Sequence, residues 1–428
     1  MKQLYNIVEL FSGIGSQKRA LNNIGIQTNE QHTYTCEWDI HAFIAYDAIH
    51  ESNQNLPEAE GMGKEALFDY LKQYTLSNNG KEAMLTATLH SYDVEILRRI
   101  YSAIKRTQNF VDISKVKGNQ LPTGIDIMTY SFPCQDLSNV GAFHHYNKGI
   151  DKDSGSRSSL LWQVGRILSE MKENDITLPR YLIMENVPTL LSARHRPNFE
   201  EWIQELKALG YISKYIPVNA CNYGIPQNRP RLLMISAFVG NNESLKNAFQ
   251  HRFDEWGENE SVIVDEYRHS PYYHNKTIED LLRIPSDKYS QLWFEAVACT
   301  PNDTVSRKKI WNENPKIIDE NDRLTGESFI RTITTKQDRH PNSGNIHFEC
   351  DIEGRGHFRY LTPRECFLFM GFTDEDYERL IGNNPMQRGR SCLFPRDKII
   401  RMAGNSIPVK MLEGFFYQLY RLEEIAGF

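Results

Sequence analysis

The chain has 428 residues, of which 40% are hydrophobic and 24% are charged, and its formal net charge at pH 7 is -6. This composition is typical of a folded globular protein and excludes a disordered or collagen-like chain. The length exceeds what one core ordinarily supports, so two domains are expected. No apolar run reaches the roughly 18 residues that span a bilayer, and no targeting segment is expected at the N-terminus.

Seven cysteines are scattered along the chain without a CxxC pair or another metal-ligand spacing. This pattern favours a reducing compartment and predicts neither disulfides nor a metal site. We therefore expect a cytoplasmic protein with no membrane partner and no metal.

The chain opens with a strand, a glycine-rich turn and a helix. The apolar run at residues 5–11 predicts a buried strand, SGIGSQ forms the turn, and residues 18–24 have a helical pattern. Such units bind nucleotides, because glycines allow close backbone approach and the helix N-terminus offers unpaired N–H groups. A dinucleotide fingerprint needs a third glycine where this chain has Lys18, so the turn alone equally suits an ordinary strand-to-helix connection.

A second strand is expected at residues 33–37, followed by Trp38 and Asp39 and a helix at residues 42–49. Glu37 stands where a ribose hydroxyl pair is bound in nucleotide-binding sheets, and Trp38 offers an aromatic face for an adenine. Together with the turn, these residues favour a cofactor that contains adenosine.

Residues 51–109 predict a helical insertion, because apolar residues recur at helical spacing with basic residues between them. The basic residues indicate a solvated face rather than a binding surface. Residues 110–113 then predict a third short strand, which places Asp112 where an adenine amino group is accepted.

The candidate nucleophile is Cys134, which follows Pro133 after an apolar run at residues 125–129. A cysteine held behind a proline at the end of a buried strand has a fixed backbone and a short path to a ligand. The alternative is an ordinary buried cysteine, which is common. The polar loop at residues 139–158, which contains His144 and His145, is expected to be a mobile lid.

Two more strands bring polar residues to the sheet edge. The strand at residues 181–184 leads into Glu185, and a strand at residues 212–219 leads into YGIPQNRPR, which holds Gln227, Arg229 and Arg231. Beyond a boundary near Gly240, residues 240–355 are expected to be irregular. Helices are predicted again at residues 362–370 and 409–425.

The order of the motifs is informative. FSGIGS, EWD, VDI, SFPCQDLS, MENV, QNRPR, RYLTPRECFLFMGF and AGNSIPV follow one another along the chain. They resemble the motif series of the cytosine-C5 DNA methyltransferases over residues 5–240 and 357–420. The resemblance implies a Rossmann-like α/β sheet that binds S-adenosylmethionine, with a second, smaller and irregular target-recognition domain.

The same resemblance implies three segments. Residues 1–239 are expected to form the catalytic cofactor-binding domain, with the helical insertion at about 51–109. Residues 240–402 are expected to form the target-recognition domain and a hinge. Residues 403–428 are expected to return to the catalytic domain.

The resemblance also implies roles for individual residues. Cys134 adds to carbon 6 of cytosine, and Glu185 donates a proton to ring nitrogen 3. Arg231 holds the carbonyl oxygen of the base, while Arg229 contacts the base or orients its loop. Gln227 is expected to be structural.

The implied cofactor site spans several motifs. Ser16 stands where many relatives in the family have glycine, a departure that concerns the fine geometry of the turn and not its role. Arg364 and Glu365 are expected to organise the fold. The expected cofactor-binding residues are Phe11, Ser12, Gly13, Gly15, Glu37, Trp38, Asp112, Ile113, Pro133 and Asn405.

The implied substrate is a cytosine flipped out of duplex DNA, with the loop after Cys134 closing over it and residues 332–345 reading base edges. The implied enzyme is a monomeric, sequence-specific modification methyltransferase, with or without a separate restriction endonuclease. Its catalytic half is similar to mollicute enzymes that methylate CpG. The alternatives are a transfer-RNA cytosine methyltransferase and a silent DNA-binding member. A nicotinamide oxidoreductase is disfavoured by the missing third glycine.

Overall fold

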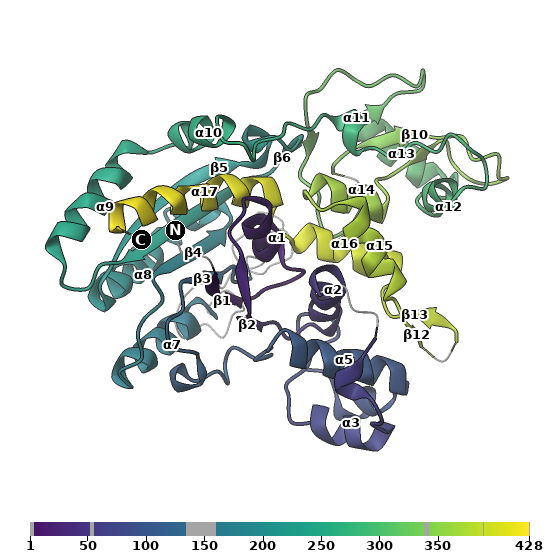
Figure 1. Ribbon diagram of the computed structural model, residues 1–428. Coiled ribbons are helices and arrows are strands. Elements are labelled where there is room, and N and C mark those ends of the chain that lie inside the picture. The colour runs from purple at the N-terminus through teal and green to yellow at the C-terminus, as the bar shows by residue number, and fades with distance from the viewer. Residues whose placement is uncertain (1–3, 52–54, 134–159, 338–341, 388, 428) are drawn as a thin grey trace. The chain divides into compact units, whose positions relative to one another are not determined.

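The computed structural model describes residues 4–51, 55–133, 160–337, 342–387 and 389–427 (Figure 1). The expected nucleophile Cys134 and the expected lid lie outside the described residues. The chain divides into two compact units. The first unit contains residues 1–218, 230–272 and 412–428, and the second contains residues 219–229 and 273–411.

The first unit is built on a six-stranded sheet, as an α/β fold predicts. Its strands follow the order β2-β1-β3-β4-β7-β5, and β7 runs antiparallel to β4, whereas β1, β2, β3 and β4 are parallel. Leu10 is in register with Cys36 on one side and with Tyr130 on the other, and Tyr130 is in register with Met184. The residues that follow these four therefore emerge at one edge of the sheet, where α/β proteins bind ligands. The strands are β1 (Tyr5–Leu10), β2 (Thr28–Cys36), β3 (Ile127–Tyr130), β4 (Tyr181–Asn186), β5 (Tyr211–Asn219) and β7 (Pro230–Phe238).

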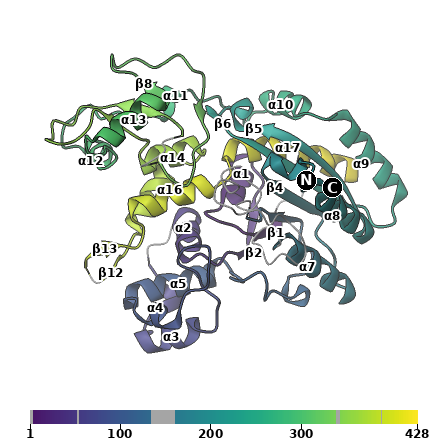
Figure 2. The same cartoon turned by 180° about the vertical axis from the view of Figure 1, so that it is seen from behind.

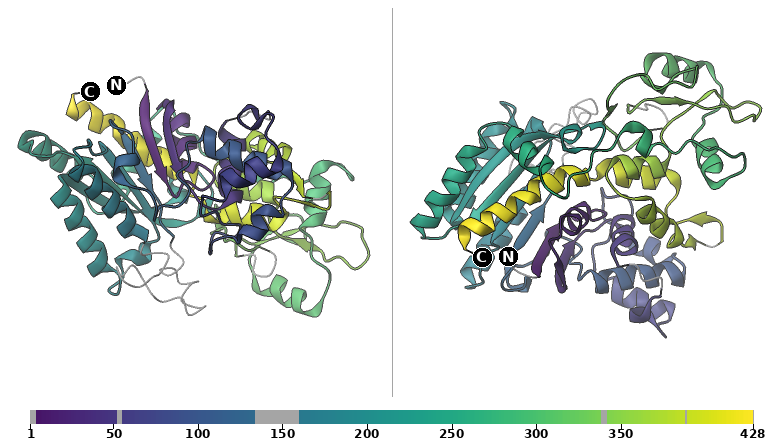
Figure 3. Two further views of the ribbon diagram at one scale, coloured as in Figure 1. Left: turned by 90° about the horizontal axis from the view of Figure 1, so that it is seen from below. Right: turned by 45° about the horizontal axis from the view of Figure 1, so that its top comes forward.

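Helices cover both faces of this sheet (Figure 3). On one face α7 and α8 bury a continuous apolar core against β1, β3 and β4, and the Trp202 indole N–H donates to the Tyr130 hydroxyl at 3.1 Å. On the other face lies α17, whose buried Glu423 accepts two hydrogen bonds of 2.9 Å from Arg180. The helices are α1 (Ser16–Asn23), α2 (Ile40–His50), α3 (Lys64–Leu71), α4 (Thr86–His90), α5 (Val94–Arg106), α7 (Leu161–Glu173), α8 (Arg196–Leu209), α9 (Glu243–Glu255), α10 (Ser261–Arg268) and α17 (Val409–Ala426).

The two units divide the chain differently from the expected domains at both ends of the second segment. Helices α9 and α10 belong to the first unit, which continues to Tyr272 and resumes at Leu412 instead of residue 403. The reason is packing against α17: Trp256 lies 6.1 Å from Phe415 between ring centroids, and Arg252 donates to the Gln418 side chain at 2.8 Å. These contacts join residues that are far apart in the sequence.

The expected helical insertion is present as α3, α4 and α5, which pack together beside the end of β2 (Figure 2). Its predicted apolar positions, Ile96, Leu97, Ile100 and Ile104, are buried. The third short strand expected at residues 110–113 is absent. The chain turns there instead, because Val111 adopts a left-handed φ of 67° and the Lys115 N–H donates to the Asp112 carbonyl oxygen at 2.9 Å.

The second unit is more regular than expected, because helices occupy much of residues 273–313. Two- and three-stranded sheets complete it. Its helices are α11 (Ile278–Leu281), α12 (Gln291–Ala298), α13 (Val305–Glu313), α14 (Pro363–Phe369), α15 (Asp374–Gly382) and α16 (Arg396–Asn405). Its strands are β6 (Gln227–Asn228), β8 (Lys316–Ile318), β9 (Ile330–Arg331), β10 (Asn345–His347), β11 (Phe358–Arg359), β12 (Met386–Gln387) and β13 (Ser391–Cys392).

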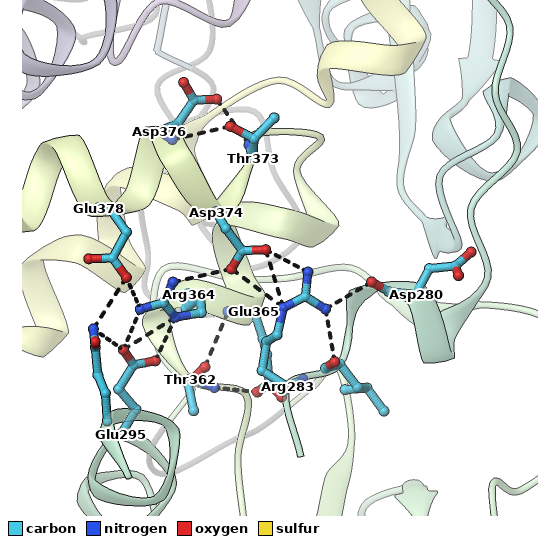
Figure 4. Close-up of polar contacts among 12 residues, drawn as sticks. Asp280, Arg283, Glu295, Thr362, Arg364, Glu365, Thr373, Asp374, Asp376 and Glu378 are labelled. Atoms are coloured by element: carbon cyan, nitrogen blue, oxygen red, sulfur yellow. Dashed lines mark hydrogen bonds and ion pairs between the residues drawn. The ribbon is translucent and has the colours of Figure 1, made fainter. Parts of the chain in front are cut away.

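The motif at the start of α14 organises this unit. Glu365 is fully buried, pairs with the Arg359 guanidinium and accepts from the Thr362 N–H at 2.8 Å, which caps the helix. The neighbouring Arg364 joins three carboxylates from α12 and α15, those of Glu295, Asp374 and Glu378 (Figure 4). These contacts are internal, which fits the expected role of Arg364 and Glu365 as fold organisers. Among the described helices of either unit, none combines the length and apolar composition needed to cross a bilayer.

Candidate active site

The turn after β1 is shaped by two glycines. Gly13 and Gly15 have φ values of 54° and 80°, which favour glycine, and a Cβ built on Gly15 would lie 2.1 Å from Nε2 of His50. The space over Gly13 is open, since a Cβ there meets nothing within 4 Å. The expected departure at Ser16 has a simple explanation, because Ser16 is already the first residue of α1 and has no need of glycine's freedom.

Polar groups in this turn remain available to a ligand. The buried Ser12 hydroxyl has no hydrogen-bond partner among the residues that the structure describes. An orphaned polar atom of this kind costs free energy unless a ligand or water pairs with it. Phe11 adjoins it with a φ of 58°.

Glu37 connects the turn to the segment after β2. Its carboxylate accepts from the Gly13 N–H at 3.2 Å and from the Asp39 N–H at 2.9 Å. Burial raises the pKa of this carboxyl to about 7, against the opposing effect of these hydrogen bonds. Trp38 follows and is half-buried. An adenosyl group fits this site, because the turn is open at Gly13, the Ser12 hydroxyl can pair with a ligand, and Glu37 and Trp38 adjoin the turn.

The Asp112 carboxylate lies in a turn rather than at a strand end. It accepts from the Ser114 N–H at 3.0 Å and from the Ser114 hydroxyl at 2.7 Å. Ile113 points into the apolar core beneath the sheet. The roles of Asp112 and Ile113 toward a cofactor stay predictions.

At the same edge of the sheet, Glu185 near the end of β4 is the centre of a polar cluster. Only 8% of the residue is exposed, its Oε2 accepts from the Ser131 hydroxyl at 2.6 Å, and its Oε1 lies 2.8 Å from Nε of Arg231 on β7. Arg231 Nη1 donates to the Pro230 carbonyl oxygen. The cluster can therefore present a carboxyl group and a guanidinium to one small ligand.

The segment that leads to Cys134 is fixed by two side chains that sequence reasoning did not single out. Ser131 bonds Glu185, and the Asn186 amide donates to the Phe132 carbonyl oxygen at 3.1 Å. The sequence contained a signal for both residues. Ser131 lies near Cys134 in the motif SFPCQDLS, and Asn186 follows Glu185 in the motif MENV. Pro133, half-buried, is the last described residue before Cys134.

Arg229 belongs to the second unit, in which its guanidinium is buried. Its Nη1 donates to the Ile333 carbonyl oxygen at 2.7 Å, and its Nη2 donates to those of Gly404 and Ser406 at 2.8 Å. Gln227 likewise bonds main-chain atoms of Ile333 and Phe369. These are contacts of residues that organise a loop. Asn405, an expected cofactor residue, is exposed at the end of α16 in this unit, and its role stays a prediction.

We expect Arg229→Met to lower the free energy of unfolding by about 3 kcal/mol, because three carbonyl oxygens would lose a charged donor. Thermal unfolding followed by circular dichroism measures this effect. Arg323→Met is the matched control, since Arg323 is exposed in the same unit. Equal melting temperatures for the two variants would contradict the structural role of Arg229.

The segment expected to read bases, residues 332–345, is only partly available for that task. Gln337 and Asn345 are each 1% exposed, and the Ser343 hydroxyl donates to Gln337 at 2.6 Å. These two side chains support the fold and are unsuited to base contact, because their polar groups face the interior. Lys336 is exposed.

No group of three or more His, Cys, Asp or Glu side chains is placed to hold a metal ion within the described ranges.

Comparison with known proteins gives a consistent result. Residues 65–421 match the sequence profile of a family described as C-5 cytosine-specific DNA methylase. The chain is 29% identical to the Type II methyltransferase M2.ScrFI of Lactococcus lactis subsp. cremoris, over 98% of this chain and 99% of that protein. It is also 29% identical to the orphan methyltransferase M.SssI of Spiroplasma monobiae, over 95% of each chain.

Solved structures share the fold. The chain resembles the S. pombe Dnmt2 methyltransferase with a TM-score of 0.58 and 17% identity, over 99% of this chain and 100% of that chain. It resembles the Entamoeba histolytica methyltransferase EhMeth with a TM-score of 0.56 and 15% identity, over 98% and 99% of the two chains. At these identities the likeness concerns the fold alone.

Proposed function

The chain belongs to the C-5 cytosine-specific DNA methylase family, and from this premise we propose that it transfers a methyl group from S-adenosylmethionine to carbon 5 of a cytosine in a short duplex DNA motif. The observation that carries the proposal is the cluster of Ser131, Glu185 and Arg231 at the sheet edge, in which Ser131 precedes Cys134 by three residues in the sequence. In the register of the sheet, the end of β3 lies between the ends of β1 and β4, so the cluster lies beside the open turn after β1.

The chemistry requires a nucleophile, because carbon 5 of cytosine is itself unreactive toward a methyl donor. In the proposed reaction the Cys134 thiolate forms a bond to carbon 6, which makes carbon 5 an enamine carbon. After methyl transfer, carbon 5 loses its proton and the carbon–sulfur bond breaks, so the ring is aromatic again and the thiolate is regenerated.

Glu185 and Arg231 would act on the other side of the ring. A protonated Glu185 donates to ring nitrogen 3, which prevents negative charge from accumulating during thiolate addition. The Arg231 guanidinium would hold the carbonyl oxygen of the base. Ser131 would fix the rotamer of Glu185, since its hydroxyl lies 2.6 Å from the carboxylate.

The cofactor supplies a methyl group activated on a sulfonium. Phe11, Ser12 and Gly13 would line its path, Glu37 would accept from its ribose hydroxyls, and Trp38 would stack on its adenine. Duplex DNA would place the target base in this site only after base flipping, because carbons 5 and 6 are inaccessible in the stack. We assign target recognition to the second unit.

A modification role follows from the relatives, one of which is named a Type II methyltransferase. Methylation of one short motif would protect that motif from an endonuclease that recognises it. We propose that the enzyme acts in the cytoplasm as a monomer, with one active site per chain.

The deciding experiment incubates the purified protein and S-adenosylmethionine with a library of random-sequence duplexes, and then maps 5-methylcytosine at single-base resolution. Methylation confined to one motif is the expected result. Methylation of transfer RNA with none on DNA would identify an RNA enzyme. No methylation of either would contradict the proposed activity.

A second prediction concerns Glu37. Glu37→Gln should weaken S-adenosylmethionine binding at pH 8 by about tenfold or more, because the amide nitrogen that replaces one oxygen cannot accept a hydrogen bond. Wild-type affinity should fall as pH drops below about 7, where this carboxyl becomes protonated. That pH dependence should vanish in the variant. Isothermal titration calorimetry measures both effects.

The same carboxyl should influence stability. Its folded-state pKa of about 7 exceeds the ordinary 4.5, so the folded protein binds the proton more tightly than the unfolded chain. Its contribution to stability is therefore largest below pH 4.5 and is lost as pH rises to about 7. The melting temperature of Glu37→Gln relative to wild type should rise across this window. Glu60→Gln, at an exposed position of the same unit, should show no such trend.

A further inference from the structure

The helical insertion contacts the segment Glu37-Trp38-Asp39 through its backbone. The Ser77 N–H donates to the Trp38 carbonyl oxygen at 2.8 Å, and the Ile40 N–H donates to the Ser77 carbonyl oxygen at 2.9 Å. The two bonds form a parallel bridge between Asp39 and Ser77, outside any strand. The main chain on both sides of Asp39 is thus held by a residue from the insertion.

Ser77 is itself held by a compact loop. The side chain is fully buried, and its hydroxyl donates to the Glu82 carbonyl oxygen at 2.7 Å and accepts from the Gly80 N–H at 3.0 Å. Gly80 has a φ of 66°, and a Cβ built on it would lie 3.1 Å from Oδ2 of Asp39. The loop therefore approaches Asp39 closely, at a position where glycine is needed.

The other end of the insertion holds the other end of the segment. Oδ1 of Asn109, which follows α5, accepts from the Glu37 N–H at 3.0 Å, and its amide nitrogen donates to the Glu37 carbonyl oxygen at 2.9 Å. Asn109 is 5% exposed. A single side chain thus satisfies both backbone groups of the residue whose carboxylate bonds Gly13.

We propose that the insertion is a positioning element for the cofactor, and that its loop at residues 76–84 sets the affinity for S-adenosylmethionine. The segment at residues 37–39 lies between β2 and α2 and belongs to neither a strand nor a helix. Holding its backbone before binding removes an entropic cost that the ligand would otherwise bear. This inference rests on the proposed function, because it takes Glu37 and Trp38 as cofactor-binding residues. Ser77 and Asn109 act through them and are positioning residues.

The loop can be excised without cutting a helix. The Met84 N–H donates to the Leu76 carbonyl oxygen at 2.7 Å. This is the hydrogen bond that joins the first and last residues of a β-turn, so a two-residue link can connect them. Replacing residues 77–83 with two glycines joins them and removes both bonds to the segment. We expect the dissociation constant for S-adenosylmethionine, measured by isothermal titration calorimetry, to rise about tenfold or more. Duplex affinity, measured by fluorescence anisotropy, should stay within twofold.

Two point variants keep the test decisive if the excised protein fails to fold. Ser77→Ala should weaken cofactor binding about threefold to tenfold, because the loop loses its internal bonds. Ser91→Ala is the matched control, since the Ser91 hydroxyl also donates to a carbonyl oxygen of the insertion, that of Thr88 at 2.7 Å. Its cofactor affinity should equal that of wild type.

The outcomes are distinguishable. If wild type binds S-adenosylmethionine and Ser77→Ala binds within twofold of it, the insertion does not set cofactor affinity and the inference is overturned. If Ser77→Ala and Ser91→Ala weaken binding equally, the effect is general destabilisation, which also overturns it. A wild-type protein that binds no S-adenosylmethionine would overturn the proposed function, and this inference with it.

Discussion

Cys134→Ala should abolish methylation of duplex DNA, lowering the rate by about 10⁴-fold or more, while duplex affinity stays within a few-fold of wild type. The reason is chemical. Without a thiolate at carbon 6 the ring never becomes an enamine, and no neighbouring group supplies an equivalent nucleophile in the proposed mechanism. Binding depends on the phosphate backbone and on base edges, which the substitution leaves untouched.

The measurement pairs tritium transfer from labelled S-adenosylmethionine with covalent trapping. In a duplex that carries 5-fluorocytosine, the carbon 5 substituent cannot leave as a proton, so the bond to the thiolate persists after methyl transfer. Wild type should form a complex that resists denaturation, and Cys134→Ala should form none. Cys221→Ala is the control, because Cys221 is a partly exposed cysteine. Turnover by Cys134→Ala would refute the assignment.

Much of the sheet edge was predictable from sequence. In parallel sheets the strands are apolar runs, and polar residues appear where each strand ends. This rule placed Glu37 after β2 and Glu185 at the end of β4, and the structure has both at these positions. The expected Rossmann-like α/β sheet is confirmed. The resemblance to the family added the order of the motifs and the identity of the reaction.

Other features were not predictable, because they depend on contacts between distant backbone segments. The bridge between Asp39 and Ser77 uses main-chain atoms alone, and no side-chain pattern encodes it. The grouping of α9 and α10 with the first unit depends on contacts such as that of Trp256 with Phe415. The strand expected at residues 110–113 is absent, because the chain turns at Val111. Val111 adopts a backbone conformation that its branched side chain disfavours, so the sequence gives no sign of the turn.

Glu185→Gln should lower the methylation rate by about 10²–10⁴-fold at saturating S-adenosylmethionine and DNA. A glutamine amide can still donate a hydrogen bond to ring nitrogen 3, but it cannot transfer a proton there, so charge accumulates as the thiolate adds. The substitution also removes the ion pair with Arg231, whose Nε lies 2.8 Å from the carboxylate. Affinity for the cofactor should be unchanged, because Glu185 is no part of the proposed cofactor site.

Glu170→Gln is the matched control for this prediction. Glu170 also accepts from one neutral donor, the Gly118 N–H at 2.7 Å, and pairs with one arginine, Arg166 at 2.6 Å, but it lies on α7, away from the sheet edge. Single-turnover rates with a synthetic duplex of the mapped motif would separate chemistry from product release. A slow Glu185→Gln beside a normal Glu170→Gln assigns the loss to proton donation at the base. Equal, small effects would mean that the carboxyl only anchors Arg231 and that protonation of the ring comes from another group.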